Sequence, residues 1–151
     1  MYKINFEQPV HVHFIGIGGI SMSGLAEVLL EEHFTISGSD NKRSPLTEQL
    51  EKAGVTIFYG QKASNIIEGI DVVVYTAAIH EDNEEYQAAV QKGLPMLSRA
   101  ELLGQLMTNY DTPIAVSGTH GKTTTTSMLS HILLSAEMDP TISVGGILKA
   151  I

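Results

Sequence analysis

Short apolar runs alternate with stretches of helical spacing as far as residue 107. Each run is only a few residues long and is bounded by glycine, proline or polar residues, which is typical of β-strands. The run at 71–75 contains three consecutive valines. It is therefore apolar on both faces, as a central strand of a parallel sheet should be. The runs predicted as strands are 10–15, 34–37, 55–58, 71–75 and 95–97.

Helices are predicted between these strands. Ser44 and Pro45 are typical of a helix start, and Gly54 is typical of a helix end. The predicted helices are the stretch carrying Ile20, Leu25, Val28 and Leu29, then 45–53, 84–92 and 99–107. This alternation implies right-handed crossovers between parallel strands. We therefore expect an α/β, Rossmann-like fold: a parallel five-stranded sheet with helices on both faces.

Residues 108–113 interrupt this pattern, because they are polar and end in proline, and they are the predicted linker. The pattern then restarts with a strand at 114–117, a glycine loop, a helix to about residue 137 and a strand at 141–144. Two strands and one helix cannot bury a sheet on both faces. The sequence thus predicts a complete domain at 1–108 and the truncated beginning of a P-loop α/β domain at 109–151.

Composition narrows the class of protein. The 151 residues include no cysteine, which favours a reducing compartment. Nine Lys and Arg against 17 Asp and Glu give a net charge of −8, so non-specific nucleic-acid binding is not expected. No apolar stretch resembles a signal peptide or a membrane span. The expected location is the cytoplasm, with no membrane partner.

The first glycine loop, Gly16-Ile17-Gly18-Gly19-Ile20-Ser21, lies between a predicted strand and a predicted helix. Glycines allow a tight turn and a close approach of the backbone to a ligand. The free amides and the positive end of the helix suit a diphosphate. Asp40 is the last residue of the segment Gly38-Ser39-Asp40 that closes the second predicted strand, where a carboxylate often binds the ribose of a nucleotide. Ser21 stands where a third glycine is usual, and a tight turn without a ligand remains the alternative.

The second glycine loop, Ser117-Gly118-Thr119-His120-Gly121-Lys122-Thr123, again separates an apolar run from a predicted helix. Gly-Lys-Thr at a helix start predicts a phosphate loop, in which Lys122 approaches the β- and γ-phosphates and Thr123 offers its hydroxyl to Mg²⁺. The usual pattern has its first glycine where Val116 stands, so this loop is shorter. A run of four threonines has low helix propensity, because β-branched side chains lose rotamer freedom in a helix. A functional demand explains these threonines at a helix start better than helix propensity does.

Together, these residues resemble the Mur ligase family, the ATP-dependent amide-forming enzymes of peptidoglycan synthesis. The similarity includes the unusual spacing of the second loop and extends over nearly the whole chain. Within the family, the first loop and the following Met22-Ser23-Gly24-Leu25-Ala26 are most similar to members that join L-alanine to UDP-N-acetylmuramate. Further matches are Gly38-Ser39-Asp40, Thr76-Ala77-Ala78-Ile79, Ser98-Arg99-Ala100-Glu101-Leu102-Leu103 and Gly145-Gly146.

The resemblance implies a three-domain enzyme that binds UDP-sugar, ATP with Mg²⁺, and L-alanine in successive domains. The muramyl carboxylate would form an acyl phosphate that the amine of alanine then attacks. This chain would hold the first domain and the start of the second, and would be inactive alone. The implied UDP-sugar residues are Gly16, Gly18, Gly19, Ile20, Ser21, Ser39, Asp40, Thr76, Ala77, Ala78, His80, Asn83 and Arg99. The implied ATP-binding residues are Gly118, Thr119, His120, Gly121, Lys122, Thr123 and Thr124, with Lys122 catalytic and Thr123 reaching Mg²⁺ through the bound nucleotide.

Other functions remain open from the residues alone. The first loop with Asp40 also fits a nicotinamide-dependent oxidoreductase, although that leaves the Lys122 loop unexplained. A non-catalytic nucleotide-sugar-binding module is a further alternative. Nearer to the leading hypothesis is a ligase that attaches a recycled peptide to the same UDP-muramate.

The histidines carry weaker predictions. His11 and His13 share one face of the first strand, but no third metal ligand is apparent. We interpret them as polar strand residues near an edge or a ligand. For His80 and Arg99, a ligand contact and a solvated side chain are equally good interpretations. The acidic run around Glu84 and Glu85 favours the positive start of its helix rather than a metal.

Overall fold

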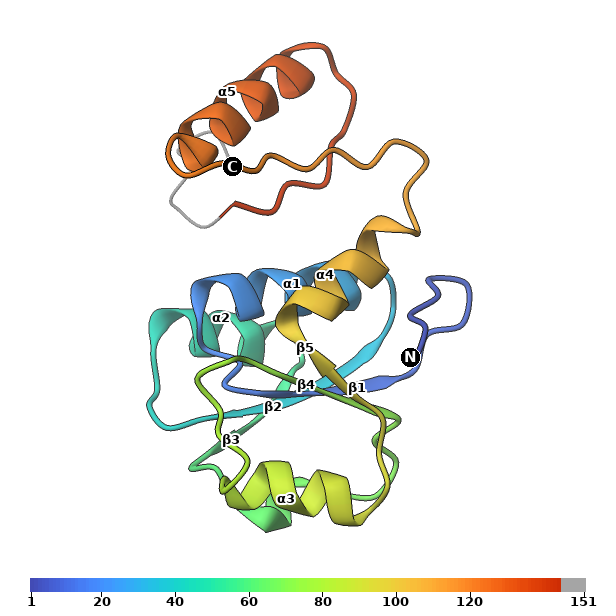
Figure 1. The fold of residues 1–151 in the computed structure, drawn as a ribbon, viewed down its shortest axis with the longest axis vertical. Coiled ribbons are helices and arrows are strands. Elements are labelled where there is room, and N and C mark those ends of the chain that lie inside the picture. Colours follow the sequence, from blue (N-terminus) through green and yellow to red (C-terminus); the bar gives the residue numbers. More distant parts are fainter. Residues whose placement is uncertain (145–151) are drawn as a thin grey trace. The chain divides into compact units, whose positions relative to one another are not determined.

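One parallel sheet organises the first part of the chain (Figure 1). The computed structural model describes residues 1–144 and divides the chain into two compact units, Met1–Asp111 and the part from Thr112 onward. The strand order in the first unit is β3-β2-β1-β4-β5, with every neighbouring pair parallel. The predicted α/β fold is therefore confirmed. The strands are β1 (His11–Ile15), β2 (Thr35–Asp40), β3 (Thr56–Tyr59), β4 (Val72–Tyr75) and β5 (Met96–Ser98).

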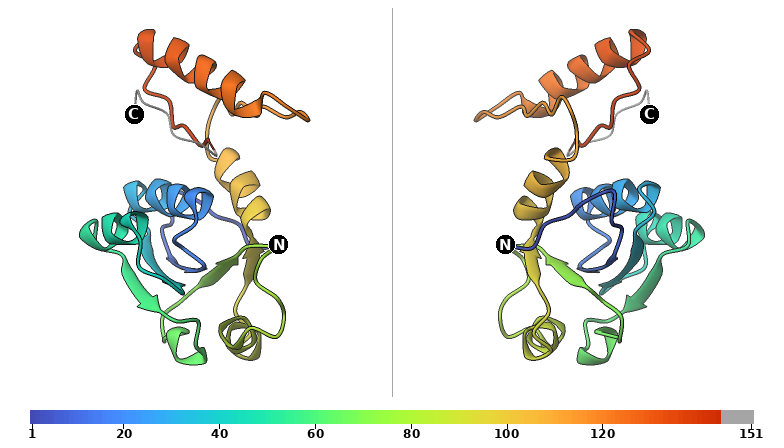
Figure 2. Two further views of the ribbon diagram at one scale, coloured as in Figure 1. Left: turned by 90° about the vertical axis from the view of Figure 1, so that its left-hand side faces the viewer. Right: turned by 90° about the vertical axis from the view of Figure 1, so that its right-hand side faces the viewer.

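Helices cover both faces of this sheet, as Figures 1 and 2 show from three directions. One face carries α1 (Ile20–Glu31), α2 (Pro45–Lys52) and α4 (Arg99–Met107). The opposite face carries α3 (Glu84–Gln91) and the short 3-10 helix η1 (Ala63–Asn65). None of the helices in the described part of the chain is long and apolar enough to span a membrane.

Each face of the sheet has its own apolar cluster because side chains alternate along a strand. Val12 and Phe14 of β1 pack with α1 and α4 in the larger cluster. Ile15 and Val73 pack in the smaller one, together with Ala89 of α3. His13 lies between Val12 and Phe14 in sequence, so its side chain enters the α3 side, where the apolar cluster is small.

Two helices begin at serine residues that cap them. Ser44 forms a capping box with Thr47 at the start of α2, and Pro45 occupies the first turn, as predicted. Ser98 forms a capping box with Glu101 at the start of α4. These backbone and side-chain hydrogen bonds to Ser98 lower the pKa of the Glu101 carboxyl.

The second unit departs from the prediction. It contains α5 (Lys122–Ser135), close to the expected helix, but residues 114–117 and 141–144 form no strand. A strand needs a neighbour for its backbone hydrogen bonds, and two short apolar runs do not build a stable sheet by themselves. The predicted strands at these positions are therefore wrong for the described residues. Gly145 and Gly146, which were part of the family pattern, lie outside the described residues.

Candidate functional site

The ligand crevice of an open parallel sheet lies where successive strands lead to helices on opposite faces. That point falls between β1 and β4, because β1 leads into α1 on one face and β4 leads towards α3 on the other. The first glycine loop follows β1, and the Thr76–Asn83 loop follows β4. Both loops singled out in the sequence therefore meet at the switch point of the sheet.

The first glycine loop is fixed by the neighbouring strand β2. The amides of Gly16 and Ile17 both donate to the carbonyl oxygen of Ser39, at 2.9 Å each. Gly16 has φ +85°, which favours glycine. Gly19 is the N-cap of α1 without a side-chain cap, and the first turn holds no acidic residue. The first amides of α1 thus lack intrahelical acceptors and present a positive end that suits an anion.

Asp40 contacts this loop directly. Its Oδ2 accepts a hydrogen bond from the Gly18 amide at 2.8 Å, and its Oδ1 accepts one from the Lys42 amide at 3.3 Å. A Cβ on residue 18 would lie 2.7 Å from Asp40 Oδ2. The absence of a side chain at Gly18 is therefore explained by Asp40 itself. The amides left for a ligand are those at and after Gly19.

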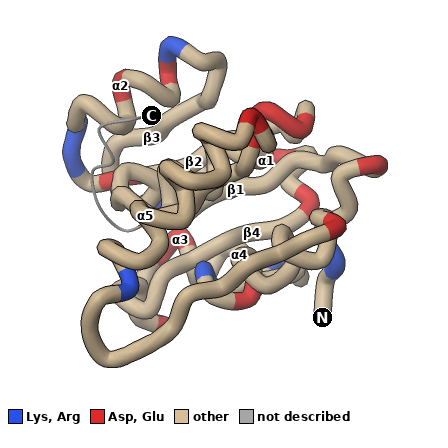
Figure 3. The backbone as a smooth tube through the Cα atoms, turned by 90° about the horizontal axis from the view of Figure 1, so that it is seen from above, with Lys and Arg blue, Asp and Glu red and all other residues tan. Residues whose placement is uncertain are grey.

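A cation lies beside the first turn of α1. Arg99, the first residue of α4, donates from Nη1 to Ser21 Oγ at 2.9 Å. The structure thus brings together two predicted site residues that are 78 positions apart. Elsewhere, the basic residues of the described chain are scattered, and their longest run is the pair Lys42-Arg43 (Figure 3). Arg99 and the helix start both place positive charge beside the first turn of α1.

The loop after β4 offers fewer free groups than predicted. Thr76 Oγ1 accepts from the Ala78 amide at 3.3 Å, while Ala77, Ala78 and His80 are exposed. Asn83 is the N-cap of α3: its Oδ1 accepts from two backbone amides of the first turn, and its Nδ2 donates to Gln61. Asn83 therefore shapes the loop with its own polar atoms engaged inside the protein.

Ser39 requires a correction. The family resemblance implied that Ser39 belongs to the UDP-sugar site, but its side chain is fully buried and donates to Glu85 Oε2 at 2.6 Å. Side chains alternate along β2, so Ser39 points to the α3 side of the sheet. It contributes to the crevice through its backbone carbonyl, which holds the glycine loop.

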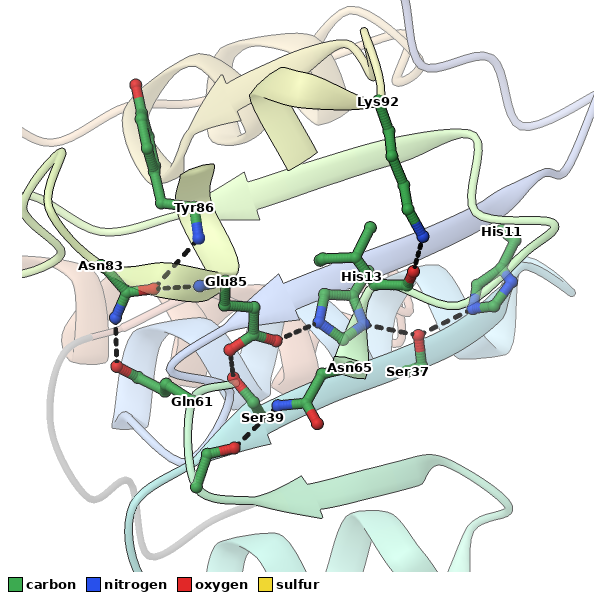
Figure 4. A network of polar contacts seen from close by, with 12 residues as sticks. His11, His13, Ser37, Ser39, Gln61, Asn65, Asn83, Glu85, Tyr86 and Lys92 are labelled. Carbon is green, nitrogen blue, oxygen red and sulfur yellow. Dashed lines mark hydrogen bonds and ion pairs between the residues drawn. The ribbon is translucent and has the colours of Figure 1, made fainter. Parts of the chain in front are cut away.

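A buried polar network lies under α3, and the sequence patterns did not predict it (Figure 4). His13 Nε2 lies 2.6 Å from Glu85 Oε1, and both side chains are fully buried. Ser37 Oγ lies 2.8 Å from His13 Nδ1 and 2.7 Å from His11 Nε2. β1 is the middle strand, so these polar strand residues do not lie at an edge of the sheet, which was one of the two expected positions. The described residues hold no group of three His, Cys, Asp or Glu suited to a metal.

His11 is the more accessible histidine of this network. Burial, and next the neighbouring His13, lower the pKa of its imidazole, against smaller opposite effects of Asp71 and Gly69. Because the folded state then binds a proton less readily than the unfolded chain, His11 favours unfolding as the pH falls through the ordinary histidine range.

The second glycine loop lies immediately before α5. Gly121 is the N-cap with φ +80°, and Lys122 and Thr123 open the helix. Lys122 Nζ donates to the carbonyl oxygens of Gly118 at 2.6 Å and Thr119 at 3.5 Å. The predicted order of loop and helix is present, with the lysine folded over its own loop.

Comparison with known proteins gives consistent matches. Residues 11–111 match the Mur ligase family, catalytic domain. Over all 151 residues, the chain is 70% identical to UDP-N-acetylmuramate–L-alanine ligase of Agathobacter rectalis and 64% identical to the protein of that name from Lachnospira eligens. In both cases the chain spans 33% of the relative's length.

Two solved structures resemble the chain closely. UDP-N-acetylmuramate-alanine ligase of Thermotoga maritima has a TM-score of 0.87 at 34% identity, covering 94% of this chain and 33% of that one. The Neisseria UDP-N-acetylmuramate:L-alanyl-γ-D-glutamyl-meso-diaminopimelate ligase has a TM-score of 0.86 at 35% identity, covering 95% and 45%.

Proposed function

The chain belongs to the Mur ligase family, and on that premise we propose that it is the UDP-sugar-binding part, with the start of the ATP-binding part, of an enzyme that joins L-alanine to UDP-N-acetylmuramate. One observation carries the proposal: the 70% identity, over every residue of this chain, to a relative named for that reaction. The crevice between β1 and β4 supplies the physical support. A cytoplasmic location, favoured by the absence of cysteine, belongs to the same proposal.

The first unit binds the UDP moiety in this proposal. The diphosphate lies against the amides of Gly19, Ile20 and Ser21, where the helix dipole and the unpaired N–H groups favour negative charge. Arg99 adds a full positive charge at the same place through its contact with Ser21. Asp40, next to Gly18, lies at the nucleoside end of this site.

The second unit contributes the phosphate loop to ATP. Its backbone amides surround the phosphates, and Lys122 leaves the Gly118 carbonyl to neutralise them. The Thr123 hydroxyl fits Mg²⁺ as one oxygen ligand. Among the described residues, no group of three His, Cys, Asp or Glu could hold a metal ion, so Thr123 is the residue proposed to reach Mg²⁺, through the bound nucleotide. When bound, the ion supplies charge neutralisation on the phosphates.

The reaction then proceeds in two displacements. The muramyl carboxylate oxygen attacks the γ-phosphorus of ATP, and ADP leaves. The amine of L-alanine attacks the resulting acyl carbon, loses a proton and expels inorganic phosphate. In this reaction, the residues of this chain bind and orient the UDP end and the ATP phosphates.

The recycling ligase remains the second candidate, because the Neisseria enzyme has nearly the same TM-score as the Thermotoga alanine ligase. The identities of 64–70% to alanine ligases favour the first candidate. Both candidates use the same UDP-muramate site.

Calorimetric titration with UDP-N-acetylmuramate tests the proposal on this chain. We expect saturable binding to one site. Arg99→Ala should weaken it about tenfold, equivalent to ~1.4 kcal/mol, because a charge-assisted contact to the diphosphate is lost. Lys122→Ala, a matched loss of a cation, should leave affinity and folding unchanged, since Lys122 donates its hydrogen bonds to Gly118 and Thr119 of its own loop.

Two results would contradict the proposal. One is the absence of heat at millimolar ligand with a chain shown to be folded. The other is saturable NADH fluorescence enhancement together with no response to the UDP-sugar, which would favour the oxidoreductase alternative.

A further inference from the structure

Hydrogen bonds to two different atoms of Ser39 connect α3 with the first glycine loop. Glu85 Oε2 accepts from Ser39 Oγ at 2.6 Å. The carbonyl oxygen of the same Ser39 accepts from the amides of Gly16 and Ile17 at 2.9 Å each. A single residue of β2 therefore connects a buried carboxylate on one side of the sheet with the loop that precedes α1.

Glu85 is itself held at the other side of the crevice. Its amide donates to Asn83 Oδ1 at 3.0 Å, so it is fixed in the turn that ends the Thr76–Asn83 loop. Its second carboxylate oxygen, Oε1, lies 2.6 Å from His13 Nε2 on the central strand β1. Figure 4 shows Glu85 between His13 and Ser39, with Asn83 at the start of the same helix. Glu85 thus links β1, β2 and the loop after β4.

A contribution to stability does not by itself explain why these polar side chains are buried here. Burying a carboxylate carries a penalty of several kcal/mol, and well-packed apolar residues usually stabilise as well as a buried ion pair does. Here, Glu85 and Ser39 are both fully buried, and no buried side-chain N or O atom within the described chain lacks a partner. A fully satisfied network of this kind fixes one geometry in place of several.

We infer that Glu85 is a positioning residue for the diphosphate site: acting through Ser39, it fixes the glycine loop so that the first amides of α1 face the ligand. The inference rests on the proposed function, because the ligand it serves is the UDP diphosphate. Glu85 itself does not touch the nucleotide. It sets the distance between the loop after β1 and the loop after β4.

Two matched variants of β2 separate positioning from stability. Ser39→Ala removes the hydroxyl bonded to Glu85, whereas Ser37→Ala removes an equally buried hydroxyl that bonds only the two histidines. With UDP as the probe, we expect Ser39→Ala to weaken binding roughly tenfold and Ser37→Ala to leave it within about twofold. Glu85→Gln, which keeps the side-chain volume, should weaken binding in the same direction as Ser39→Ala.

Amide resonances of the unliganded chain give a second reading that does not depend on binding. Ser39→Ala should shift the signals of Gly16, Gly18 and Gly19, and Ser37→Ala should not. The inference would be overturned if folded Ser39→Ala and Glu85→Gln bound UDP as tightly as the unaltered chain does, or if their glycine signals were the same as those of the unaltered chain. If the unaltered chain fails to bind UDP, the proposed function fails, while the glycine signals still decide whether Glu85 positions the loop.

Discussion

Replacing Glu85 with alanine is expected to lower the free energy of unfolding by about 3–5 kcal/mol. The carboxylate is fully buried and contacts both His13 and Ser39 at 2.6 Å. Its removal leaves a buried imidazole and a buried hydroxyl without their partner, and it opens a cavity between α3 and the sheet. Domains of this size are stable by only about 5–15 kcal/mol, so a large part of the stability is lost.

Urea unfolding followed by circular dichroism measures this loss. Glu84→Ala is the matched control, because Glu84 precedes Glu85 on the same helix and is exposed. Its cost should stay within about 0.5 kcal/mol. A cost below about 1 kcal/mol for Glu85→Ala would contradict the structural role given to the buried pair.

Replacing Gly38 with alanine is expected to destabilise the first unit by about 1–3 kcal/mol. A Cβ at this position would lie 2.7 Å from Ile17 Cδ1, 2.8 Å from Ile17 Cβ and 2.8 Å from the carbonyl oxygen of Phe14. Gly38 lies in the middle of β2, paired with Phe14 of β1, so the carbonyl cannot move without disturbing the sheet. The glycine loop would be displaced together with Ile17.

Gly24→Ala is the control with the opposite expected sign. Gly24 lies within α1, and apart from its chain neighbours and the backbone of α1 itself, no atom lies within 4 Å of a Cβ placed there. Alanine should therefore stabilise the chain by about 0.5–1 kcal/mol through its better helix propensity. Thermal unfolding of the two variants gives the comparison. A stabilising or neutral Gly38→Ala would show that β2 and the loop adjust to the added methyl group.

Much of the fold follows from local patterns in the sequence. The helix at 99–107 has the predicted bounds, because its capping box and its apolar spacing agree. β2 extends to Asp40, beyond the predicted Ser37, because Gly38 and Ser39 still pair with β1. Glycine and serine are typical of turns, so Gly38 and Ser39 by themselves predict the end of a strand. Pairing with a central neighbour outweighed local preference.

Long-range contacts could not be predicted in the same way. His13 and Glu85 are 72 positions apart, and Glu85 belongs to an acidic stretch that otherwise resembles an exposed helix start. One signal was present in the sequence: His11 and His13 are two positions apart on β1, as Ser37 and Ser39 are on β2. His13 is the register partner of Ser37. Only the position of α3 in the fold shows that Glu85 is the carboxylate that contacts His13 and Ser39. The strand predictions in the second unit were wrong for a related reason, because a strand needs a neighbouring strand for its backbone hydrogen bonds.

The central claim is that the first turn of α1 receives a nucleotide diphosphate, with Arg99 at its side. A crystal structure of this chain with UDP tests it most directly. We expect diphosphate oxygens within hydrogen-bond distance of the Gly19, Ile20 or Ser21 amides, and uracil and ribose on the Asp40 side. A complex in which UDP occupies another surface, with this turn empty, would contradict it.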